Sequence, residues 1–122
     1  MFLYYLEIII ELIVGLSILN VWLLNRNKST PWRAKDASNM QEEFAVYGLS
    51  KSMMIVVGTL KCFCAVILLV SIFYPAVEWI GAAGIAMLMA AAISMHVKVN
   101  DPPKKSIPAA IFLILSLVII FI

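Results

Sequence analysis

Four long apolar segments constrain this chain more than any other feature of its sequence. They cover roughly residues 2–24, 53–74, 76–97 and 107–122. A membrane-spanning helix needs about 20 apolar residues, and the first three segments are long enough while the fourth is only slightly short. Just 13% of the residues are charged, whereas soluble domains have about 25%, and the mean hydropathy is +1.04. We therefore predict an all-α protein with a single membrane domain, a four-transmembrane-helix bundle.

A short amphipathic helix is predicted in the long connection between the first two spans, at about residues 38–48. Ser38 and Gln41 have the spacing of a capping box. The apolar residues that follow recur at helical spacing: Met40, Phe44 and Tyr47. We expect this segment to lie in the membrane interface or against the mouth of the bundle. The alternative is a solvated loop in which the spacing is incidental.

Basic residues predict the orientation in the membrane, because they are confined to the first and third connections. These residues are Arg26, Lys28, Arg33, Lys35, Lys51, Lys98, Lys104 and Lys105. The second connection and both termini have none. Since basic loops stay on the cytoplasmic side, we expect loops 1 and 3 to be cytoplasmic and both termini to face the opposite side. A bacterial inner membrane is the expected location.

Lys61 stands in the middle of an otherwise apolar run. A charge at bilayer depth costs about 2.5–3.5 kcal/mol on insertion scales, so it persists where it is paired or used. Glu7 and Glu11 share one face of the first predicted helix, and Glu11 lies at nearly the depth of Lys61. We predict a Glu11–Lys61 ion pair that either fixes the helix register or belongs to a proton-active or anion-binding site. Glu7 lies nearer the outer face, where it either snorkels or is protonated.

The third segment carries a face of small residues. They recur at every fourth position with a glycine nearby, as Gly81, Ala82, Ala86, Ala90 and Ser94. Such spacing lets helix backbones approach closely in lipid. We expect this face to pack inside the bundle or against another subunit.

His96 ends the third segment beside the third connection. Its expected neighbours are Asp101, Tyr47 and Trp32, while Lys61 is expected to be out of reach. We predict a His96–Asp101 hydrogen bond that shapes the loop. A contact with a ligand or a proton on the cytoplasmic side is the alternative. The chain has no second histidine, so no metal site is predicted.

The sequence contains no motif for autonomous catalysis. It has no glycine-rich phosphate loop, no Cys-x-x-Cys and no serine nucleophile with a base nearby. Cys62 and Cys64 would point to nearly opposite faces of one helix, which makes them packing residues rather than a disulfide. A net charge of only +2 does not indicate binding to nucleic acid. We expect no catalytic residues, and an enzyme is disfavoured.

Two stretches resemble the DoxX-like family of small four-helix membrane proteins. The first is Glu42–Met53, which reads EEF-x-x-YGL-x-K and leads to Lys61. The second is His96–Pro102, followed by two lysines and Pro108. The resemblance covers nearly the whole chain and implies a single four-helix bundle. It also implies links to quinone-coupled sulfur oxidation, membrane oxidoreductase complexes or the chaperoning of receptor subunits, and fold analogy does not choose among them.

Two functions are expected from the residues and the resemblance together. The first is a non-catalytic accessory or assembly subunit, which binds another membrane protein or a second copy of itself in the lipid bilayer. The alternative is an oxidoreductase-associated subunit that binds a quinone or another lipophilic ligand. Glu11 and Lys61 would then hold the ligand's head, and Trp22, Phe63 and Met87 would line its tail. A small transporter is the least favoured function, because so short a chain would have to oligomerise to form a pore.

Overall fold

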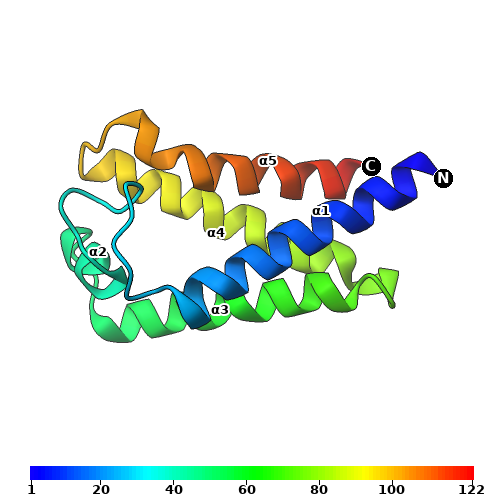
Figure 1. The fold of residues 1–122 in the computed structure, drawn as a ribbon, viewed down its shortest axis with the longest axis horizontal. Helices are drawn as coiled ribbons and strands as arrows, with labels where there is room; N and C mark the ends of the chain where they lie inside the picture. Colours follow the sequence, from blue (N-terminus) through cyan, green and yellow to red (C-terminus); the bar gives the residue numbers. More distant parts are fainter.

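The computed structural model describes all 122 residues, which form helices and connecting loops without any strand. Four helices run along the length of the molecule (Figure 1): α1 (Phe2–Leu19), α3 (Lys51–Val70), α4 (Glu78–Lys98) and α5 (Ile107–Phe121). A π-helical turn at Asn20–Leu24 continues α1, and 3-10 turns at Pro75–Val77 and Pro103–Ser106 precede α4 and α5. With these turns, all four elements are long and apolar enough to cross a membrane. The predicted fold class is confirmed.

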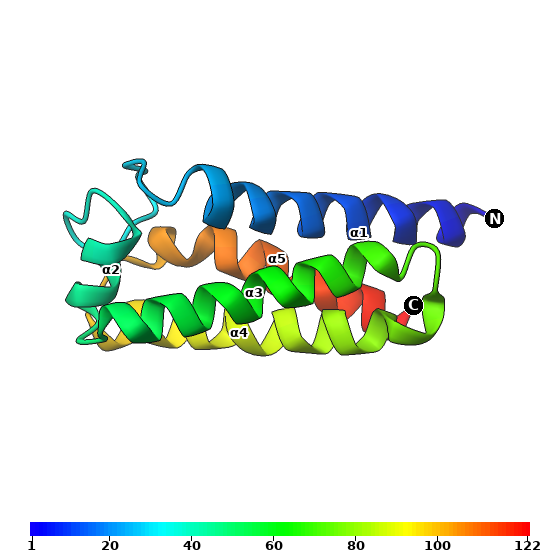
Figure 2. The ribbon, with the colours of Figure 1, turned by 90° about the horizontal axis from the view of Figure 1, so that it is seen from below.

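The chain passes up and down through the bundle, so the two termini lie together at one end (Figure 1). The first and third connections lie at the opposite end. We name these the terminal end and the loop end. α4 packs against both α3 and α5, while α1 lies against α3 and α5 (Figure 2). Each helix contributes a fully buried residue to the core: Val14, Leu68, Ile85 and Ile119.

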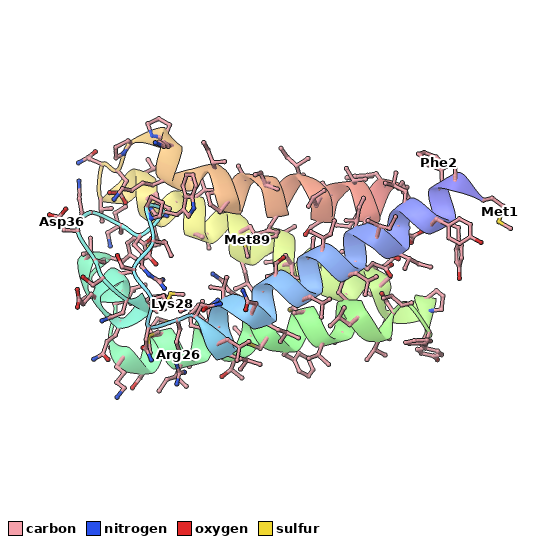
Figure 3. The ribbon with its side chains drawn as sticks, viewed as in Figure 1. Met1, Phe2, Arg26, Lys28, Asp36 and Met89 are labelled. Atoms are coloured by element: carbon pink, nitrogen blue, oxygen red, sulfur yellow. The ribbon has the colours of Figure 1, made fainter.

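Many large apolar side chains instead point away from the bundle, as expected for helices surrounded by lipid. Phe63 is 63% exposed and Met87 is 74% exposed. Met89 is buried and extends from α4 into the interior (Figure 3). The expectation that Met87 lines the tail of an interior ligand is therefore wrong, and Phe63 borders only an outer groove between α1 and α3.

The first connection, between α1 and α3, contains a short helix, α2 (Met40–Val46), as predicted, but its cap is shifted by one residue. The N–H of Glu42 donates to Oδ1 of Asn39 at 2.8 Å, and the Glu42 carboxylate accepts from the N–H of Ser38 at 3.0 Å. The capping box is thus Asn39–Glu42 and not Ser38–Gln41. Both pairs have the required spacing, and the glutamate at position 42 can accept the reciprocal hydrogen bond as a charged group.

α2 covers the loop end of the bundle (Figure 1). Met40, Phe44 and Tyr47 are all buried, which confirms the helical spacing read from the sequence. Gly48 follows with a φ of +80°, a conformation that side chains disfavour, and the chain then turns into α3. The amphipathic helix is therefore folded against the bundle.

Gly81 allows α4 to approach α3 closely. A Cβ atom at this position would lie 3.0 Å from the backbone nitrogen of Leu68 and 3.1 Å from the carbonyl oxygen of Cys64. Both neighbours are backbone atoms of α3, which cannot rotate away as a side chain can. The two helices therefore have no room for a larger residue here.

The small-residue face of α4 is only partly used inside the bundle. Ala82 and Ala86, which follow Gly81 in the half of α4 nearer the terminal end, are buried. Ala90 and Ser94, nearer the loop end, are exposed, and the Ser94 hydroxyl donates back to the carbonyl of Ala90 at 2.9 Å. Three of the five residues of the predicted face thus pack within the chain, and the other two lie on the outer surface.

Replacing Gly81 by valine should destabilise the fold by about 1–3 kcal/mol, because overpacking would push α3 and α4 apart. Thermal unfolding in mild detergent, followed by helical circular dichroism, measures the effect. Met87→Val on the exposed side of the same helix is the control and should unfold close to wild type. Equal stability of Gly81→Val and Met87→Val would contradict the close approach described above.

Candidate functional site

Arg33 organises the loop that precedes α2. Its side chain is buried, although it belongs to a polar connection. The guanidinium donates to the backbone carbonyls of Asn25, Arg26 and Lys28 at 3.0–3.3 Å. It also forms an ion pair with Glu43 at 3.2 Å. A fifth partner is the sulfur of Met40, at 3.4 Å. Since one planar group binds five partners, Arg33 fixes the path of the chain across the loop end.

Glu43 on α2 is the centre of this network. Besides Arg33, its carboxylate accepts hydrogen bonds from the N–H of Ala34 at 2.9 Å and from the hydroxyl of Tyr47 at 3.0 Å. Burial raises the pKa of Tyr47 well above its ordinary value, and the charge of Glu43 raises it further. The hydroxyl therefore stays protonated and remains a donor.

His96 joins α4 to the same network. Its Nδ1 lies 2.7 Å from the carboxylate of Asp101, which confirms the predicted hydrogen bond. Because a carboxylate only accepts, Nδ1 carries the proton, and Nε2 faces the Tyr47 hydroxyl at 3.4 Å. Nε2 also lies 4.0 Å from Glu43. His96 thus links the third connection of the bundle to α2.

Asp101 and Lys105 hold Lys35 from two sides. The Lys35 N–H donates to Asp101 at 3.0 Å, and the Lys105 ammonium donates to the carbonyls of Lys35 and Arg33 at 2.6 Å. Lys35 has a φ of +49°, a left-handed conformation that is unusual for a residue with a side chain. Burial alone would raise the pKa of Asp101, but hydrogen bonds from His96 and Lys35 outweigh it and hold the pKa below its usual value.

A row of aromatic rings leads from this network into the bundle. Trp22, Phe44, Tyr47 and His96 follow one another with centroids 5.8–6.0 Å apart, each pair edge to face. All four side chains are buried. The row connects α1, α2 and α4, and so closes one side of the loop end.

Lys61 lies beyond this row and has no acidic partner. Its Nζ lies 5.3 Å from the centroid of the Trp22 ring, a cation–π contact, and it forms no ion pair. The predicted Glu11–Lys61 pair is therefore wrong. The long stem of Lys61 extends toward the loop end, whereas Glu11 lies near Glu7 and Glu78 at the terminal end.

A cavity of about 480 Å³ opens among these groups at the loop end. We name it the loop-end cavity. Sixteen of its 24 lining residues are hydrophobic, Tyr47 with its hydroxyl among them, and the polar ones include Lys61, His96 and Glu43. Trp32, which is 37% exposed, also lines it. The sequence placed His96 out of reach of Lys61, but both side chains border this one space because Lys61 extends along α3 toward the loops.

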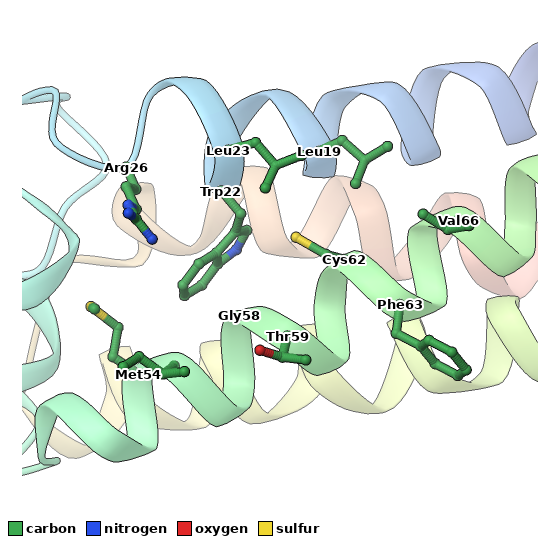
Figure 4. A pocket seen from close by; sticks show the side chains of 11 residues that line it. Leu19, Trp22, Leu23, Arg26, Met54, Gly58, Thr59, Cys62, Phe63 and Val66 are labelled. Atoms are coloured by element: carbon green, nitrogen blue, oxygen red, sulfur yellow. The ribbon is translucent and has the colours of Figure 1, made fainter.

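Trp22 separates this cavity from a second hollow between α1 and α3 (Figure 4). This groove has a volume of about 460 Å³, and Leu19, Gly58 and Cys62 are among its lining residues. Figure 4 shows the Trp22 ring extending from α1 to Gly58. A methyl group at Gly58 would overlap the ring. Gly58 is therefore what lets the indole approach the backbone of α3 so closely.

A second polar cluster lies at the other end of the bundle. Glu7, Glu11 and Glu78 each place a carboxylate oxygen within 4.8 Å of the others. The sequence pointed to Glu7 and Glu11 but not to Glu78, which it placed at the start of an apolar segment. Nothing in the spacing of the chain indicates that the first turn of α4 meets α1 at this level.

Arg33, Glu43 and Lys105 are the loop-end residues that sequence reasoning missed. Arg33 and Lys105 counted only as loop charges that set the orientation, and Glu43 only as part of a motif. The available signal was the EEF stretch at the start of the amphipathic helix. In it, one glutamate caps the helix and the next is turned inward.

The chain was compared with known protein families, curated proteins and solved structures. A family model described as the DoxX-like family matches residues 32–119. The match includes Lys61 and all the side chains of the loop-end network, and it leaves out the carbonyls of residues 25–28 that Arg33 binds and α1 with Glu7, Glu11 and Trp22. No curated protein and no solved structure matches the chain.

The order of the loop 25–39 should depend on acid pH through Asp101. Its pKa is lower in the folded protein than the usual value of about 3.9, so the stability that the ionised carboxylate contributes to the loop is fully present above that pH. This stability is lost as the pH falls through the lower pKa that Asp101 has in the folded protein. We expect amide hydrogen exchange of residues 25–39, corrected for its intrinsic pH dependence, to accelerate below about pH 4 in the wild type.

Asp101→Asn should show faster exchange in this loop at neutral pH and no further step in acid. Asp36→Asn, which removes an exposed carboxylate of the same loop, should behave like the wild type. An acid step that survives in Asp101→Asn would assign the effect to another carboxylate.

Proposed function

This chain belongs to the DoxX-like family, and we propose that it binds a lipophilic molecule with an electron-rich head group in the loop-end cavity. The single observation that carries the proposal is Lys61, an ammonium inside a membrane bundle with no acidic partner. Ionisable residues within transmembrane segments are costly and are typical of functional sites. A ligand oxygen would supply the acceptor that the chain does not.

The head of the ligand would lie between Lys61 and His96. Lys61 offers three N–H donors, whereas Nε2 of His96, which carries no proton when Nδ1 does, would accept a hydrogen bond from the head group; it lies 3.4 Å from the Tyr47 hydroxyl and 4.0 Å from Glu43. A quinone carbonyl, a carboxylate or a phosphate would each accept from the ammonium. Glu11, expected to share the head group, lies in the terminal cluster and has no part in this proposal.

The apolar walls of the cavity suit a hydrocarbon or isoprenoid tail. Ile18, Val57, Met89 and Phe112 line it from the four long helices. A volume of about 480 Å³ lies within the range of about 300–1,000 Å³ that is common for small-molecule sites. Because the cavity offers donors and apolar walls rather than a nucleophile with its base, we propose binding or delivery of a lipophile, such as a quinone, beside a membrane oxidoreductase.

A role as an accessory or assembly subunit is the second candidate, and the outer half of the α4 small-residue face favours it. Ala90 and Ser94 are exposed, although the same face packs tightly against α3 farther along the helix. Small residues spaced by four let another transmembrane helix approach closely. The partner would be another membrane protein or a second copy of the chain.

Replacing Lys61 by methionine should remove the ligand while keeping the length of the side chain. Native mass spectrometry of protein released gently from its own membranes should show a small lipophilic adduct in the wild type and none in Lys61→Met. In titrations with a short-chain quinone, affinity should fall about 10- to 100-fold, since a hydrogen bond from a charged group contributes about 1.5–3 kcal/mol.

Lys51→Met is the matched control, because Lys51 is an exposed lysine at the start of the same helix and does not line the cavity. It should retain the adduct. An adduct that persists unchanged in Lys61→Met, or a wild type that carries none and does not bind the quinone, would refute the proposed site.

Ala90→Leu should disrupt an association through α4 without unfolding the chain, because position 90 is exposed. Chemical crosslinking in native membranes, followed by mild solubilisation, should show a larger complex in the wild type that is reduced several-fold in the variant. Ile111→Leu, a volume-conserving change at an exposed position on α5, is the control. Recovery of the wild type as a monomer only would exclude the accessory role.

A further inference from the structure

The three glutamates at the terminal end form a site that the proposed function does not use. Glu7 and Glu11 lie on successive turns of α1, and Glu78 is the first residue of α4. One carboxylate oxygen from each lies within 4.8 Å of the other two. The fold therefore brings together acidic groups from two helices that are separated by more than half of the chain.

No basic side chain compensates this cluster. None of the three glutamates forms an ion pair, and all lysines, arginines and the histidine lie in the loops, at the loop end of the helices or at Lys61. Glu11 is only 2% exposed, and its Oε2 accepts no hydrogen bond. A buried carboxylate oxygen without a partner is an unsatisfied acceptor that points to a missing positive group.

Like charges at this separation repel strongly away from bulk water, so three ionised carboxylates require a counter-charge. Oxygen-only clusters of carboxylates suit hard cations such as Ca²⁺, Mg²⁺ and Mn²⁺. Two oxygens that each lie about 2.4 Å from one Ca²⁺ ion can be at most about 4.8 Å apart. The observed spacing therefore admits one ion of this size between the three side chains.

We propose that Glu7, Glu11 and Glu78 bind one divalent cation of the calcium type at the terminal end of the bundle. Glu11 supplies the buried ligand, and the half-buried Glu7 and Glu78 close the site toward the terminal end. Water from that side completes the coordination sphere. The ion would join the first turn of α4 to α1.

The test uses the full chain in nanodiscs of phosphatidylcholine, a lipid without net charge. Mn²⁺ binding is followed by the loss of the free-ion electron paramagnetic resonance signal, and Ca²⁺ is used to displace it. We expect one saturable site per chain in the wild type. Glu11→Gln should weaken binding about 10- to 100-fold, and so should Glu78→Gln. Glu42→Gln, in the exposed cap of α2, should leave binding unchanged.

Thermal unfolding separates loss of the site from loss of the fold. Without divalent ions, Glu11→Gln should be at least as stable as the wild type, because it removes a repelling charge. Added Ca²⁺ should raise the melting temperature of the wild type and not that of the variant. A wild type with no saturable Mn²⁺ binding up to millimolar concentration, or binding that is equal in Glu11→Gln, would overturn the proposal. In the first case, protonation alone would neutralise the cluster.

Discussion

The buried carboxylate of Glu43 is the group on which the loop end depends. It binds the guanidinium of Arg33, the N–H of Ala34 and the hydroxyl of Tyr47, and through Tyr47 it reaches His96 on α4. Removing one partner of a buried ion pair leaves the other charge uncompensated. The loss in folding free energy is then larger than the stabilisation that the intact pair provides. The loop, α2 and α4 are therefore fixed relative to one another through Glu43. The loop-end cavity beneath them depends on this arrangement.

The fold was predictable because hydropathy and helical period act over 20 residues at a time. Four apolar runs, a proline at each of two breaks and the alignment of Met40, Phe44 and Tyr47 were sufficient for the bundle and its covering helix. The site was harder to predict. The His96–Asp101 bond spans five residues, so local spacing could indicate it. The role of Glu43 depends on residues from the preceding loop and from α4, which no local pattern aligns.

The failed Glu11–Lys61 pair shows why depth alone does not assign partners in a membrane bundle. Glu11 and Lys61 lie at similar depths along their two helices, but the lysine stem extends toward the loop end and away from Glu11. The acidic residue in the first turn of α4 stands at the edge of an apolar segment, so the sequence did not indicate it as a partner. Glu11 instead lies with Glu7 and Glu78, and an aromatic ring takes the place of the acid beside Lys61.

The division of charge between the two ends gives the molecule an electric dipole along the bundle axis. All nine lysines and arginines lie at the loop end or line its cavity, together with four of the seven acidic residues, while the other three form the terminal cluster. Moving one charge across a potential of 100 mV changes the energy by about 2.3 kcal/mol. In any membrane that carries a voltage, one insertion direction is therefore electrically favoured, and binding a divalent cation at the terminal end would reduce that preference.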